Sequence, residues 1–134
     1  MSRCGGQGLV EYALVLPVFL LITFGIMEFG FLFLQYSTIA NAAREGARTG
    51  ILPVTQACPV DCVRGRARAA ALALTTGLDT SPDKFSVDPT FSVDGRSIVV
   101  TVAYTTELIT GPVIQAVGGN PEIVLQSTAT MNRE

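Results

Sequence analysis

The sequence predicts an α+β fold in which a long N-terminal transmembrane helix extends into a small head, made of one helix on a roughly three-stranded antiparallel sheet. Three observations support this prediction. The residues from Ala13 to Leu34 are mostly apolar and include a single charge, Glu28. Apolar residues continue at helical spacing beyond this run. The C-terminal part contains strand-like segments around Asp94-Gly95, a strong hairpin signal.

The apolar run is long enough to cross a bilayer. As an α-helix its 22 residues would span about 33 Å, which matches a hydrocarbon core of about 30 Å. A secretory signal peptide is the alternative, since Arg3 precedes the apolar residues. However, the apolar part of a signal peptide is shorter and ends at a cleavage site, so we expect a retained membrane helix. Pro17, near the start of this helix, predicts a kink or a loosened turn.

Glu28 is a functional candidate because it lies within the apolar run, about 22 Å along the helix from Ala13. Three alternatives are open. The carboxyl group is protonated, or it pairs with Arg44 or Arg48 of a neighbouring chain shifted along the helix axis, or the membrane span is displaced toward the N-terminus so that Glu28 reaches the interface. Within one chain Arg44 is about 24 Å away along the helix, which is too far for an ion pair.

The helix is expected to continue beyond the membrane, because apolar residues recur at helical spacing on one face. From Leu9 to Arg48 it would be about 60 Å long. Gly50 and Pro53 are expected to end it. The residues expected to form the apolar stripe of this extension are Tyr36, Ile39, Ala40, Ala43 and Ala47.

The head is expected to contain one further helix, capped by Asp61 and ending at about Gly77. Its arginines, Arg64, Arg66 and Arg68, are expected to form a solvated face, although a basic patch for a partner is the alternative. The residues expected to face inward are Val63, Ala67, Ala70, Ala71, Leu74 and Leu78.

Three strands are expected to follow. Residues 90–93 and 96–104 flank Asp94-Gly95 and predict a hairpin, and residues 122–131 predict a third strand. The connection between the last two strands contains several glycines and prolines, and it is expected to include a helical turn at residues 113–117.

Catalysis has little support in the sequence. The chain has no histidine, and no glycine-rich phosphate cradle follows a strand. A zinc site would lack ligands, and the acidic residues of the turns do not show calcium-ligand spacing. The pI of about 5.0 argues against nucleic-acid binding. We therefore expect neither an enzyme nor a cofactor or metal.

The N-terminal residues resemble a known family. The segment Gly6–Tyr12, a glycine followed by four residues and then Glu-Tyr, resembles the prepilin processing site of tight-adherence (Tad, or Flp) pilins. Residues 14–17 and 24–30 resemble the membrane helix of TadE-like pseudopilins, and residues 41–48 resemble the stretch that follows it. Beyond Gly50 the chain resembles this family only in its general order of a helix followed by strands.

The resemblance implies that a prepilin peptidase cuts between Gly6 and Gln7. Glu11 would then be the fifth residue of the mature chain, next to Tyr12, and its carboxylate would pair with the free amino terminus of a neighbouring subunit and set the register between them. The alternative is that Glu11 lies in the headgroup region as a solvated charge. The candidate assembly residues are Glu11, Tyr12, Glu28, Arg44 and Arg48.

The expected organisation is a cleaved leader at residues 1–6, a transmembrane and assembly helix at 7–34, an extramembrane continuation at 35–50 and a soluble pilin-like head at 51–134. Loss of the leader would discard Cys4 and leave Cys58 and Cys62, for which we expect a disulfide in an oxidising compartment, with two unpaired thiols as the alternative. The head would thus lie outside the inner membrane, although Arg3 before the span and Arg44 and Arg48 after it favour the opposite orientation.

The function implied by the resemblance is that of a minor pseudopilin, which assembles into or primes a Tad pilus or secretion apparatus for adhesion. The implied partners are the major Flp pilin, a second minor pilin, copies of this chain, the prepilin peptidase, and the inner-membrane assembly platform with its motor. Two alternatives remain: a principal filament subunit, and a single-pass membrane-anchored binding module that does not polymerise.

Overall fold

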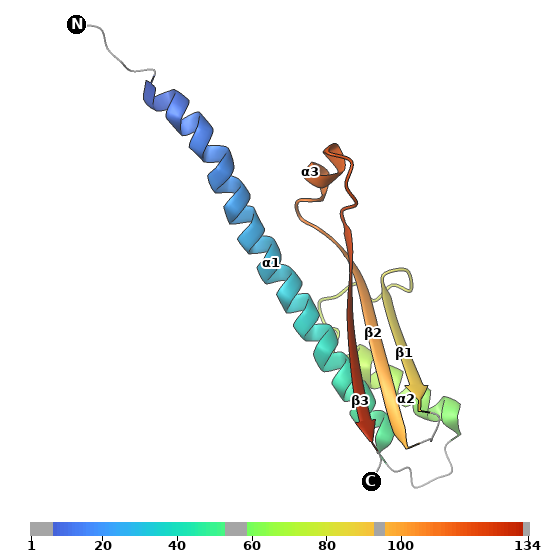
Figure 1. Ribbon diagram of the computed structural model, residues 1–134. Coiled ribbons are helices and arrows are strands. Elements are labelled where there is room, and N and C mark those ends of the chain that lie inside the picture. Colours follow the sequence, from blue (N-terminus) through green and yellow to red (C-terminus); the bar gives the residue numbers. More distant parts are fainter. Residues whose placement is uncertain (1–6, 53–58, 93–95, 133–134) are drawn as a thin grey trace, which may run out of the picture.

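The structure is a computed structural model, and it describes residues 7–52, 59–92 and 96–132. It confirms the predicted α+β class. Along the chain the elements are α1 (Gln7–Ile51), α2 (Val60–Ala73), β1 (Phe85–Phe91), β2 (Ser97–Glu107), α3 (Gly111–Ala116) and β3 (Glu122–Asn132). Figure 1 shows α1 as a long rod whose C-terminal half packs against the sheet, while its N-terminal half projects away from the head.

Helix α1 has 45 residues and runs without interruption through Pro17. It continues beyond the apolar run, as the sequence predicts, and it ends at Ile51, just after Gly50. In the expected apolar stripe Ile39, Ala43 and Ala47 are buried, whereas Tyr36 is exposed. The prediction for Tyr36 is therefore wrong, because the face that meets the sheet passes through Gln35 and Ala42 instead.

The sheet is antiparallel and has the order β1-β2-β3. The predicted hairpin of the first two strands is present, with Phe91 opposite Ile98, and the Ser92 N–H donates to the Ser97 carbonyl at 2.9 Å. The Asp94-Gly95 turn itself lies outside the described residues. Strand β1 begins before the predicted position 90, and it includes Pro89, which an edge strand tolerates because one side of its backbone needs no partner.

Helix α2 begins earlier and ends sooner than the sequence predicts. The Pro59 carbonyl accepts hydrogen bonds from the N–H groups of Cys62 and Val63, so that Pro59, and not Asp61, occupies the N-cap position. At the other end the Thr75 N–H and hydroxyl both donate to the Leu72 carbonyl, which tightens the last turn and ends the helix at Ala73. As a result Leu74, which was expected to face inward, is 46% exposed.

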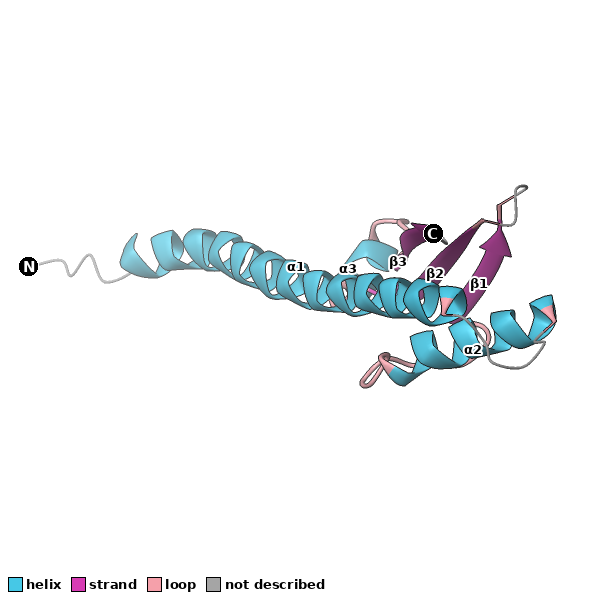
Figure 2. Ribbon diagram, turned by 90° about the horizontal axis from the view of Figure 1, so that it is seen from below, coloured by secondary structure: helices cyan, strands magenta, loops and turns pink. Residues whose placement is uncertain are grey.

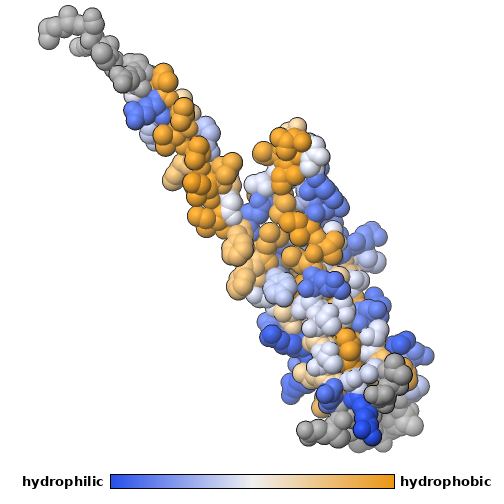
Figure 3. All heavy atoms as spheres, viewed as in Figure 1, coloured by the Kyte–Doolittle hydropathy of each residue, from blue (hydrophilic) through white to orange (hydrophobic). Residues whose placement is uncertain are grey.

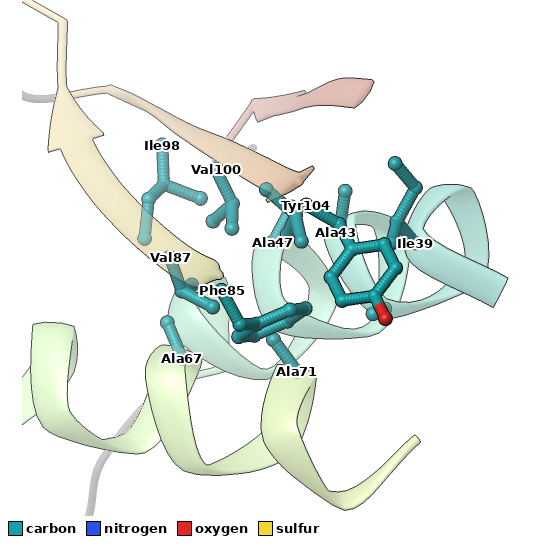
Figure 4. Close-up of a cluster of buried hydrophobic side chains, with 12 residues drawn as sticks. Ile39, Ala43, Ala47, Ala67, Ala71, Phe85, Val87, Ile98, Val100 and Tyr104 are labelled. Atoms are coloured by element: carbon teal, nitrogen blue, oxygen red, sulfur yellow. The ribbon is translucent and has the colours of Figure 1, made fainter. Parts of the chain in front are cut away.

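The core lies between the sheet and the two helices α1 and α2 (Figure 4). Apart from Ile39, the helices contribute alanines, and β1 and β2 contribute the larger side chains, so the backbones come close together. At Gly46 an added Cβ would lie 3.0 Å from the Ala67 carbonyl oxygen and 3.2 Å from Val100 Cγ1, and at Gly50 it would clash with Ile98 Cδ1. These two glycines thus set the spacing between α1 and the rest of the head. Figure 2 shows the layers end on, with α2 and the sheet on different sides of α1.

Candidate functional site

The N-terminal half of α1 is an exposed apolar surface. Helix α1 is long and apolar enough to cross a membrane, and none of its most apolar 18-residue window is buried within the described part of the chain. Figure 3 shows this half as a nearly continuous hydrophobic band. This half of the helix can therefore serve as a single-pass membrane anchor, because side chains this apolar are stable in lipid or against other apolar helices.

Glu11 and Tyr12 lie near the amino end of α1, and both are exposed. Glu11 forms no ion pair or hydrogen bond with the residues that the structure describes. Its carboxylate is therefore available to a group outside this chain. The expected pairing with the amino terminus of a neighbour stays a prediction, and Gly6 lies outside the described residues.

Glu28 contacts a residue that the sequence analysis did not associate with it. Its carboxylate accepts two hydrogen bonds from Thr110, one from the backbone N–H at 3.2 Å and one from the hydroxyl at 2.6 Å. Thr110 immediately precedes α3, in the connection between β2 and β3. The Thr-Gly-Pro sequence at positions 110–112 indicates the start of a helix, because proline is common in the first turn of a helix. Nothing in the sequence indicates that Thr110 contacts Glu28.

The two arginines near the C-terminal end of α1 are exposed. Arg48 Nη1 lies 3.4 Å from Glu45 Oε2, and the Thr49 hydroxyl donates to the other oxygen of that carboxylate at 3.3 Å. An exposed pair of this kind contributes about 0–1 kcal/mol. Arg44 has no ion pair among the described residues. The structure does not bring either arginine to Glu28 within one chain, so the suggested contact between chains stays a prediction.

An apolar groove of about 510 Å³ lies between α1 and α3, and the Glu28–Thr110 contact forms part of its wall. In Figure 3 it is visible as a gap between the hydrophobic band of α1 and a second hydrophobic surface at the end of the β2–β3 hairpin. The residues that line it are Pro17, Leu20, Leu21, Phe24, Gly25, Glu28, Thr110, Val113 and Ile114.

Gln35 follows Glu28 by two helical turns on the side of α1 that meets the head. Its side chain is 5% exposed, and its Oε1 has no hydrogen-bond partner within the described part of the chain. The sequence assigns no role to Gln35, because a single glutamine in a helical pattern carries no signal of its own.

Cys62 is disulfide-bonded. Its expected partner, Cys58, lies outside the described residues, so this particular pairing stays a prediction. Within residues 7–52, 59–92 and 96–132, no group of three or more His, Cys, Asp or Glu side chains could hold a metal ion.

Asp79 lies in the exposed segment between α2 and β1. The pKa of its carboxyl group is lowered, chiefly by the backbone N–H of Ser81, which donates to Oδ1 at 3.1 Å, and also by the Ser81 side chain. Lys84 contributes a weaker effect in the same direction on this pKa. This arrangement is a turn closed by a carboxylate, and it indicates a structural role for Asp79.

Residues 6–48 match the TadE-like protein family. The TadE-like segment covers almost all of α1, including Glu11, Glu28 and Arg44, and it stops before the head begins. It confirms the resemblance inferred from the sequence and indicates a pilin-like protein associated with a Tad pilus. No curated protein and no solved structure matches the chain.

Proposed function

We propose that this chain is a minor pseudopilin of a Tad-type pilus. In this proposal a prepilin peptidase removes residues 1–6, and the mature chain enters the filament through the N-terminal half of α1. One observation carries the proposal: the TadE-like segment coincides with an exposed apolar helix that has an unpaired carboxylate, Glu11, at its amino end.

The exposed half of α1 explains why a filament would be stable. On leaving the membrane, its apolar side chains would have to be covered, and burial stabilises by about 25 cal/mol for each Å² removed from water. Side-by-side packing with the helices of other subunits provides that burial. The implied partners are the major Flp pilin, a second minor pilin and copies of this chain, assembled by the inner-membrane platform and its motor.

Glu11 would set the register of that packing. A carboxylate within an apolar bundle is costly unless a positive group pairs with it. Cleavage after Gly6 would create such a group, the amino terminus of Gln7, close to Glu11 on the helix. The amine of one subunit could then meet Glu11 of the next only at a defined stagger, and a subunit that is out of register would leave both charges unpaired.

The disulfide of Cys62 supports a head outside the cytoplasm, because such bonds persist in oxidising compartments. The chain would then be a single-pass protein of the inner membrane, with its head on the extracytoplasmic side until it enters a pilus.

The first test is the amino-terminal residue and intact mass of the protein from cells that carry the cognate peptidase. We expect a chain beginning at Gln7. A chain that still begins at Met1 or Ser2 would instead support a membrane-anchored binding module.

The second test is co-purification of the E11A variant with pili, compared with E45Q, which changes a half-buried carboxylate on the same helix outside the apolar half. We expect E11A to remain in the membrane and E45Q to be recovered with pili at the wild-type level. Recovery of E11A at the wild-type level would contradict the proposal. If the wild-type chain were as abundant in pili as the main filament subunit, it would be a principal subunit and not a minor one.

A further inference from the structure

The connection between β2 and β3 forms an uncharged tip, which we define as residues 108–121 and which contains α3. Figure 1 shows that it extends from the sheet toward the N-terminal end of α1. We propose that the tip inserts into the hydrocarbon layer beside α1, and that lipid acyl chains fill the groove between them. The chain would then enter the membrane at two places, whether or not it later joins a filament.

The first argument is the depth in the membrane at which the groove lies along α1. Its α1 wall extends from Pro17 to Glu28, which is about 16 Å of helix. If the hydrocarbon layer of about 30 Å begins at Ala13, this wall lies about 6–22 Å inside it. If the layer instead begins at Leu9, the wall lies about 12–28 Å inside it. The tip residues that complete the groove, Val113 and Ile114, therefore face hydrocarbon in either placement.

The side chains of the tip are the second argument. Residues 108–121 include no charged residue, while Glu107 and Glu122 lie opposite each other at its base. The large apolar side chains of the tip point outward: Ile109 is 58% exposed, Val113 68% and Val117 82%. In water such a cluster would be unfavourable, whereas in lipid the same exposure is stabilising.

The backbone of the tip is the third argument, because a polar group without a partner is costly in hydrocarbon. Pro112 and Pro121 have no N–H group to satisfy. The Leu108 N–H donates to the Pro121 carbonyl and closes the base of the tip. Within the tip, backbone N–H groups that donate to backbone carbonyls include those of Gly111, Val113, Ile114, Val117, Gly118 and Gly119.

The Glu28–Thr110 contact completes this pattern. A carboxylate inside the apolar layer needs hydrogen-bond donors, and Thr110 supplies two of them from the tip. The tip in turn needs an acceptor for the Thr110 N–H and hydroxyl groups, which Glu28 supplies. Each of the two inserted segments thus satisfies polar groups of the other.

Lipid is the occupant that this geometry favours. The α1 wall of the groove is continuous with the exposed apolar side chains on the other faces of the same helix, including Val18, Phe19 and Ile22. These residues lie at the same depth in the bilayer as the groove, so the lipid that surrounds them also reaches the groove. A helix of a second subunit could replace the lipid only after assembly.

The absence of tryptophan from this chain allows a direct test. We would place a single tryptophan in the V113W and V117W variants and reconstitute each in nanodiscs at one copy per disc, so that no neighbouring chain can cover it. F24W on the groove side of α1 is the control for hydrocarbon, and T128W on the exposed outer face of β3 is the control for water. The probe is a lipid brominated on its acyl chain, which quenches tryptophan on contact.

We expect V113W and V117W to emit at wavelengths close to that of F24W, and to lose at least about half as much fluorescence to brominated lipid as F24W does. Red-shifted emission without quenching, as expected for T128W, would overturn the proposal. Blue-shifted emission without quenching would also overturn it, because protein and not lipid would then cover the tip. Val117 is so exposed that its substitution by tryptophan should not disturb folding, and circular dichroism checks this for each variant.

Discussion

Glu28 and Thr110 are 82 positions apart in the chain, and two hydrogen bonds join them. This contact connects the apolar half of α1 to the end of the β2–β3 hairpin, so the head is held to α1 both at its core and at its tip. A rigid head–helix unit is useful in an assembling subunit, because the position of one helix in a bundle then fixes the position of its head.

Replacing Thr110 by valine should weaken this connection. The T110V variant keeps the shape of the side chain but loses the hydroxyl donor to Glu28. Because hydrogen bonds to charged groups contribute about 1.5–3 kcal/mol, we expect a loss of that size in the free energy of docking the tip. The measurement is hydrogen exchange of peptides from residues 108–121 in nanodiscs, which should become faster by about 10- to 100-fold.

The matched control is T128V, which removes the hydroxyl that lies 3.2 Å from the Thr101 hydroxyl on the exposed face of the sheet. This bond is neutral and accessible to water, so exchange in the tip should not change. Equal exchange in the tip of T110V and the wild type would show that the Glu28 contact does not hold the tip in the bilayer.

The parts of the fold that the sequence predicted correctly depend on local signals. The long helix follows from a continuous apolar run and its periodic extension, and the hairpin follows from Asp94-Gly95 between two strand-like segments. The end of α2 could not be predicted in the same way. The position of Leu74 depends on the bonds that Thr75 makes to Leu72, and a helical pattern alone would continue to Gly77.

The residues of the candidate site could likewise be predicted only where a local sequence signal marks them. Glu11 and Glu28 were identifiable because a charge in an apolar helix stands out. Thr110 was not, because a threonine in a loop is ordinary and its importance comes only from a contact across the fold. Whether the uncharged tip lies beside the membrane helix or away from it likewise depends on the tertiary structure.

Replacing Gly46 by alanine should destabilise the head. The new Cβ would lie 3.0 Å from the Ala67 carbonyl oxygen, which belongs to the backbone of α2 and cannot move without shifting that helix. Overpacking of this kind costs about 1–3 kcal/mol, which exceeds the gain of about 1 kcal/mol that alanine brings to a helix. We expect a lower melting temperature of the head, measured by circular dichroism in detergent.

The control for Gly46 is G30A on the same helix, where an added Cβ meets nothing within 4 Å. This variant gains the same helix propensity without a clash, so the head should melt at the wild-type temperature or slightly above it. If G46A also melted there, α1 and α2 would not be packed as closely as the structure shows.

The disulfide of Cys62 gives a prediction about the connection between α1 and α2. If the partner is Cys58, the bond closes a loop of five residues, and the reduced entropy of the unfolded chain stabilises the head by about 2 kcal/mol. The C62S variant should lose that amount, measured by denaturant unfolding, and should expose one thiol to a maleimide reagent without reduction.

The labelling distinguishes the predicted pairing from its alternatives. In a chain that begins at Gln7 and keeps a Cys58–Cys62 bond, we expect no reactive thiol before reduction and two after it. In C62S the labelled peptide should contain Cys58. If Cys58 of a wild-type chain that keeps its leader were instead labelled before reduction and Cys4 were not, Cys62 would be bonded to Cys4, a residue that processing removes. The disulfide would then be incompatible with a mature pilin, and the proposed leader cleavage would be contradicted along with the pairing.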